Sequence, residues 1–117
     1  MAQRAWVPGP ADWHGFTVST GGDAVPGGYN GYVRLVDRPT GALVGYLDWQ
    51  TARGSDEVLV AMVEVDPGFR RRGLATAMLD YVLRYQFDGP MTVSWGATTS
   101  DGEALRRAWK DPGHYRS

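Results

Sequence analysis

The fold of this chain is decided by one stretch, VLVAMVEVDPGFRRRGLA, which covers residues 58–75. Its first part, residues 58–65, is apolar and rich in β-branched side chains, a composition typical of a buried strand. The strand ends at a turn sequence, Asp66-Pro67-Gly68, and apolar residues recur with helical spacing from Leu74 onward. The stretch therefore predicts a strand, a tight turn and a helix in close succession.

Three arginines, Arg70, Arg71 and Arg72, lie where this helix should begin. Positive charge is unfavourable there, because the helix dipole favours acidic groups at its N-terminus. We therefore expect an anion to complete the site, bound by free N–H groups, with Gly73 allowing its close approach. The alternative is a solvated arginine cluster or a contact to nucleic acid. Other phosphate-binding patterns are absent, since Gly27-Gly28 lies outside any dinucleotide-binding fingerprint.

Residues 70–75 resemble Arg/Gln-x-x-Gly-x-Gly/Ala, the acyl-coenzyme A pyrophosphate loop of the GNAT family of N-acetyltransferases. The preceding strand and its Val65-Asp66-Pro67 ending look like the same family's motif, and the resemblance covers roughly residues 30–114. It implies an α+β fold with the three-layer GNAT-like arrangement. The expected core is a mostly antiparallel mixed sheet with a βαβ crossover and flanking helices.

Patterns elsewhere in the chain agree with this order of elements. We interpret residues 1–117 as a single compact acyl-CoA-binding domain, with residues 1–28 as a poorly matched N-terminal segment. Strands are expected at 15–20, 29–37, 42–50, 57–65 and 91–95, the last of them buried, and residues 21–28 are expected to be a loop. Helices are expected at about 72–87 and at 102–110, the second capped by Ser100-Asp101.

Composition limits the function classes. A length of 117 residues fits one domain, and a net charge of −1 provides no overall field that would recruit nucleic acid or a membrane. The chain has no cysteine, which excludes thiolate catalysis, and its two histidines cannot alone form a zinc site. We see neither a signal peptide nor a membrane-spanning apolar run, so we expect a cytoplasmic protein without a metal.

The resemblance assigns the acyl donor, acetyl-CoA, to specific positions. Main-chain groups of Val63, Glu64 and Val65 would bind its pantetheine arm. The pyrophosphate would lie against the backbone from Arg71 to Ala75, a stretch that contains Arg72, Gly73 and Leu74, and Thr76 could add a hydroxyl. Either Arg70 or Arg71 would reach the 3′-phosphate.

Two carboxylates are candidates for deprotonating or binding an amine acceptor. Glu64 is the only charged residue within an apolar strand, so we expect a raised pKa suited to a general base. The alternative is that Glu64 pairs with an arginine at a strand end. Asp48 could recognise a cationic acceptor.

The general acid is where the resemblance fails. The family's last helix carries a tyrosine that protonates the leaving thiolate, and Trp109 falls at that position. An indole is a poor proton donor for this purpose, so Trp109 is expected to pack or to line the coenzyme channel. Tyr115 is our candidate substitute, with His114 or water as alternatives.

The leading hypothesis is an N-acetyltransferase that moves an acetyl group from acetyl-CoA to a primary amine of a small molecule, peptide or protein. The alternative is a non-catalytic acyl-CoA-binding or regulatory module; a nucleic-acid or protein interaction domain is less favoured. Family elements that normally wall the acceptor site are missing, so the site is open or completed by another chain. Five tryptophans would support a homodimer if one or two were exposed.

Overall fold

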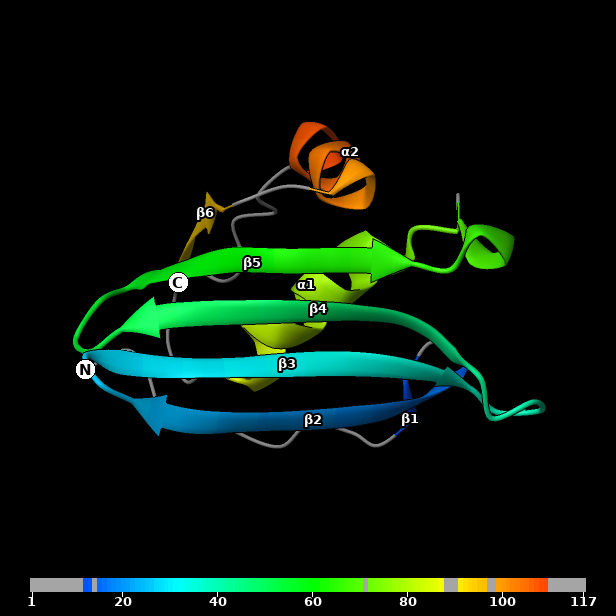
Figure 1. Cartoon of the computed structure of the whole chain (residues 1–117), viewed down its shortest axis with the longest axis horizontal. Helices are drawn as coiled ribbons and strands as arrows, with labels where there is room; N and C mark the ends of the chain where they lie inside the picture. Colours follow the sequence, from blue (N-terminus) through cyan, green and yellow to red (C-terminus); the bar gives the residue numbers. More distant parts are fainter. Residues whose placement is uncertain (1–11, 14, 71, 88–90, 97–98, 110–117) are drawn as a thin grey trace.

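The computed structural model describes residues 12–13, 15–70, 72–87, 91–96 and 99–109. Within these residues, six strands form one sheet in chain order, and two helices pack with it (Figure 1). Every neighbouring pair is antiparallel except β5–β6, which is parallel. The elements are β1 (Asp12–Trp13), β2 (Phe16–Val25), β3 (Gly28–Asp37), β4 (Leu43–Ala52), β5 (Glu57–Val65), a 3₁₀ turn (Pro67–Phe69), α1 (Leu74–Tyr85), β6 (Thr92–Trp95) and α2 (Ser100–Ala108). The predicted α+β class, the mixed sheet and the βαβ crossover are confirmed.

The core lies between the sheet and α1, which crosses behind β3, β4 and β5 in Figure 1. Its buried face comprises Leu74, Met78, Leu79, Tyr81, Val82 and Leu83. The facing strand residues include Leu35, Leu47 and Trp49, each with 0% exposure. Burial of one such large apolar side chain contributes about 1.5–3 kcal/mol. This packing fixes the position of α1 and therefore of the loop before it.

The opposite face of the sheet is polar and accessible. Alternate residues of β3, β4 and β5 point to it, and neither α1 nor α2 covers it among the described elements (Figure 1). Because side chains alternate along a strand, the buried Leu47 and Trp49 are interleaved with the half-buried Tyr46 and Asp48. The described elements therefore leave this face uncovered.

The prediction of a loop at residues 21–28 is wrong, because β2 continues to Val25 and pairs along its length with β3. Glycine has low strand propensity, yet here it makes room for aromatic rings. A Cβ on Gly21 would lie 2.6 Å from the Tyr32 ring, and one on Gly31 would lie 2.4 Å from Trp49. The glycines that suggested a loop are thus part of the sheet.

Smaller differences concern element ends. Helix α1 is shorter than expected, and α2 begins at Ser100 with Thr99, not Ser100-Asp101, as its N-cap. Strand β6 is half-buried because it pairs only with β5 and forms the edge of the sheet as far as the structure describes it.

A β-bulge in β5 creates a gap at this edge. Asp48 pairs with Met62 and Trp49 pairs with Val60, so Ala61 is an extra residue. Strand β6 pairs with β5 only as far as Val60, and the N–H of Gly96 donates to its carbonyl. Beyond the bulge, backbone groups of β5 face a gap into which none of the described strands continues.

Candidate functional site

The turn after β5 is held by short-range contacts. The carboxylate of Asp66 accepts from the N–H of Gly68 at 2.9 Å, and Pro67 begins the 3₁₀ turn. The chain then reaches Gly73, whose φ of +74° lies in the left-handed region. That conformation costs a residue with a Cβ roughly 1–2 kcal/mol, which explains the glycine. No described heavy atom lies within 4 Å of where a Cβ would be, so the position borders open space.

The N-terminus of α1 is suited to an anion. Gly73 provides no side-chain cap, and the first turn contains no acidic residue. The first intrahelical bond runs from the N–H of Ala77 to the carbonyl of Gly73, so the preceding N–H groups have no acceptor within the helix. Such N–H groups, together with the helix dipole, favour phosphate.

A pocket of about 350 Å³ lies between this turn and α2. Its α2 wall comprises Asp101, Ala104, Leu105 and Ala108. The predicted coenzyme residues that line it are Val65, Arg70, Gly73, Leu74, Ala75 and Thr76. Val63 does not line this pocket. Its carbonyl accepts a hydrogen bond from Thr99, just before α2. Arg71 lies outside the described residues.

The arginines have different surroundings. The guanidinium Nε of Arg70 is 3.3 Å from the Val65 carbonyl and 3.3 Å from the Asp101 carboxylate. Arg72 is exposed, with its guanidinium 4.9 Å from the centre of the Phe69 ring. The arginine run is thus partly paired within the chain.

Two residues at the start of α2, its N-cap Thr99 and Asp101 of its first turn, contact β5, and the sequence did not single them out for this edge. The hydroxyl of Thr99 donates to the Val63 carbonyl at 2.6 Å, and the Val65 N–H donates to Asp101 at 2.8 Å. Both pairs are 36 residues apart in the chain, so no local pattern could have indicated them.

Glu64 lies on the accessible face of the sheet. The expectation of apolar surroundings is wrong: its side chain is exposed and accepts a 2.6 Å hydrogen bond from Tyr46, not from an arginine. This hydrogen bond is the largest of the influences that raise the pKa of Tyr46 to about 12. The phenol therefore stays protonated at neutral pH and remains a donor to Glu64.

Asp48 follows Tyr46 by two residues in β4, so it lies on the same face of the sheet. It pairs with Met62, next to the bulge in β5. Burial raises the pKa of its carboxyl, and the nearby Arg34 partly offsets this. Asp48 lines a hollow of about 390 Å³ together with Tyr32 and Met62. Cross-strand diagonal neighbours are roughly 7–8 Å apart, so Asp48 and Glu64 could both approach one bound amine.

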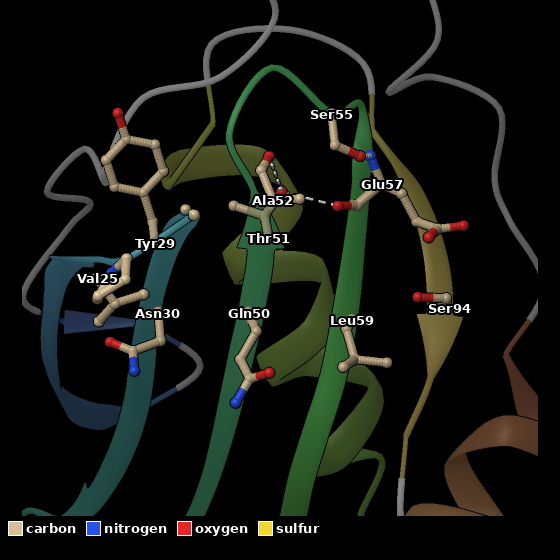
Figure 2. Close-up of a pocket in the computed structure, with 13 residues that line it drawn as sticks. Val25, Tyr29, Asn30, Gln50, Thr51, Ala52, Ser55, Glu57, Leu59 and Ser94 are labelled. Carbon is tan, nitrogen blue, oxygen red and sulfur yellow. Dashed lines mark hydrogen bonds between the residues drawn. The ribbon is translucent and has the colours of Figure 1, made fainter.

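A further hollow, of about 490 Å³, lies at the far end of the strands (Figure 2). Its lining includes Glu57, Leu59 and Ser94, and none of the predicted coenzyme residues. Asn30 and Gln50 border both this hollow and the one at Asp48, so the two adjoin along the accessible face.

The predicted general acid, Tyr115, and its alternative His114 lie outside the described residues. Trp109 follows α2 and packs, half-buried, against the core, as expected. Trp49 and Trp95 also pack there, so these three tryptophans provide no exposed aromatic face for a dimer.

Among the described residues, no three His, Asp or Glu side chains are grouped to hold a metal ion. Neither described helix has the length and apolar character needed to cross a membrane.

The sequence profile described as "Acetyltransferase (GNAT) family" matches residues 10–111. The chain belongs to the GNAT acetyltransferase family. A search of curated proteins gave no match. Among solved structures, the chain is similar to a "Tandem GNAT protein from the clavulanic acid biosynthesis pathway (without AcCoA)". The TM-score is 0.54 at 20% identity, over 87% of this chain and 43% of that chain. This likeness supports the GNAT fold, and the chain spans less than half of its structural relative.

Proposed function

We propose that this GNAT domain transfers an acetyl group from acetyl-CoA to a primary amine. The observation that carries the proposal is the uncapped α1 N-terminus at Gly73 beside the edge of β5 that no described strand pairs with. An uncapped helix start suits a pyrophosphate, and backbone groups at a strand edge that no described strand pairs with suit the two amides of a pantetheine arm. Both features border one pocket, the size of which fits part of a coenzyme.

In the proposed reaction, the neutral amine nitrogen attacks the thioester carbonyl carbon. A carbon–nitrogen bond forms, the carbon–sulfur bond breaks, and the nitrogen loses one proton while the departing thiolate gains one. Glu64 would accept the proton lost by the ammonium group. Its hydrogen bond from Tyr46 fixes the carboxylate on the accessible face, where an acceptor can approach the β5 edge. Tyr115, if it reaches the sulfur, would return a proton to the thiolate.

Calorimetry tests the coenzyme site. Acetyl-CoA should bind near one molecule per chain, and adenosine 3′,5′-bisphosphate, which lacks the arm, should bind more weakly. Thiol release from acetyl-CoA in the presence of candidate amines then measures turnover. Absence of coenzyme binding would contradict the proposal.

A non-catalytic acyl-CoA-binding module is the second candidate. The observation that favours it is Trp109 at the position where the family carries its tyrosine acid, since the half-buried indole packs against the core. Saturable coenzyme binding without thiol release, across a wide panel of amines, would support this module over the enzyme.

We also propose that a second copy of the chain could complete the acceptor site, because the accessible face lacks a described helical cover. The structural relative is a tandem protein, of which this chain spans 43%. Sedimentation analysis distinguishes monomer from homodimer.

Replacement of Asp48 with asparagine should separate acceptor binding from stability. Loss of the charge that would hold an ammonium group is expected to raise KM for the amine about tenfold or more. Because burial raises the pKa of Asp48, the ionised carboxyl costs stability at neutral pH, and the variant should be more stable there. The stability gain should vanish below about pH 4, where the carboxyl is protonated in both states. Initial rates and thermal unfolding at several pH values measure the two effects.

A further inference from the structure

The contacts of Thr99 and Asp101 lie on the backbone groups that the coenzyme arm would use. Thr99 donates to the Val63 carbonyl, and Asp101 accepts from the Val65 N–H. An amide-containing arm that pairs with β5 needs the same two groups, a donor for the carbonyl and an acceptor for the N–H. One side-chain pair therefore imitates the hydrogen bonding of an added strand.

Further contacts hold Thr99 and Asp101 in place, within α2 and to the loop before α1. The Thr99 hydroxyl also accepts from the Gly102 N–H at 3.0 Å, which makes it the N-cap of α2. Asp101, only 15% exposed, joins the Val65 N–H to Arg70, the first arginine of the pyrophosphate loop. Leu105, 2% exposed, holds the helix against the core. The first turn of α2 is thus tied to β5 and to the loop together.

We propose that Thr99 and Asp101 form a latch that competes with the pantetheine arm for the edge of β5. This inference rests on the proposed function. Coenzyme binding then requires the first turn of α2 to withdraw from Val63 and Val65, and the same movement releases Arg70 from Asp101. The latch keeps the strand groups hydrogen-bonded while no coenzyme is present, which lowers the apparent affinity by the fraction of closed molecules.

The decisive variant is Asp101→Ala, compared with Glu103→Ala. Both residues are acidic and lie in the first turn of α2, so both variants lose a similar helix-dipole contribution. Of the two, Asp101 is the one that contacts β5 and Arg70. Removal of the latch leaves the Val65 N–H to be satisfied by the arm, so acetyl-CoA should bind about fivefold to tenfold more tightly to Asp101→Ala. Glu103→Ala should match the wild type.

Adenosine 3′,5′-bisphosphate provides the second probe, because it lacks the arm. Its affinity should rise less than that of acetyl-CoA in Asp101→Ala, because the release of Arg70 acts on both ligands, whereas only acetyl-CoA has an arm that can pair with β5. An equal gain for the two ligands would overturn the latch. Unchanged or weaker acetyl-CoA binding by Asp101→Ala would overturn the latch while leaving the proposed function intact. If neither the wild type nor the variant binds acetyl-CoA, both the latch and the proposed function fail.

A measurement on the wild type keeps the test valid if Asp101→Ala does not fold. Acetyl-CoA should shift the amide resonances of Thr99 and Gly102, whereas the bisphosphate should leave them unchanged. If acetyl-CoA binds and both amide resonances keep their chemical shifts, the first turn of α2 does not move, and the latch is overturned.

Discussion

Gly73→Glu should abolish acetyl-CoA binding, with affinity reduced roughly a hundredfold or more by a negative charge placed at the pyrophosphate site. Gly73 has a φ of +74° and borders open space beside the α1 N-terminus, so a side chain there would occupy the anion's position. The carboxylate would itself interact with the free N–H groups. Calorimetric titration with acetyl-CoA measures the loss.

The matched control is Gly54→Glu. Gly54 has a φ of +78°, and a Cβ there would likewise have no described heavy atom within 4 Å, but the residue lies in the turn between β4 and β5. Both variants should lose about 1–2 kcal/mol of stability from left-handed strain. Only Gly73→Glu should lose coenzyme. Equal affinity in the two variants would refute the assignment of the loop.

Glu64→Gln should lower kcat by about a hundredfold or more, since a positioned general base contributes about 10²–10⁴ to the rate. Acetyl-CoA affinity should hardly change, because the proposed coenzyme contacts of this strand are made by backbone groups. The glutamine keeps an oxygen that can accept from Tyr46, so the local geometry should survive. Steady-state rates over a range of pH provide the measurement.

Two further variants separate catalysis from general charge. Glu57→Gln removes an exposed carboxylate at the other end of β5 and should have no effect on kcat. Tyr46→Phe removes the donor to Glu64 and should lower kcat by less than Glu64→Gln does. A kcat that is the same for Glu64→Gln and wild type at every pH would exclude Glu64 as the base.

Local patterns were sufficient where periodicity and turn chemistry act within a few residues. Strand β5 has the predicted bounds, and the turn at Asp66-Pro67-Gly68 and a helix follow it as expected, although the helix is shorter than the predicted 72–87. The loop predicted at residues 21–28 was wrong for a nonlocal reason. Whether glycine favours a loop or a strand depends on the ring packed against it, and the partners of Gly21 and Gly31 are set by sheet register.

In the candidate site too, local sequence located some residues, and others became apparent only from the structure. The sequence placed Gly73 and its neighbours at the start of α1, and the structure lines one pocket with them. The sequence could not predict that the Glu64 side chain is exposed, because an apolar strand sequence does not reveal which face of the sheet is covered. The partner of Glu64, Tyr46, became apparent only through pairing of β4 with β5.

By itself, the sequence determined the strand–turn–helix unit and the family resemblance, because these depend on side-chain periodicity and on glycine and proline geometry over short distances. The tertiary structure alone decided three other features: the bulge at Ala61, the gap at the edge of β5, and its occupation by Thr99 and Asp101. These features depend on strand register and on hydrogen bonds between residues 36 positions apart. Such contacts form only when the whole sheet has assembled, so no local pattern encodes them.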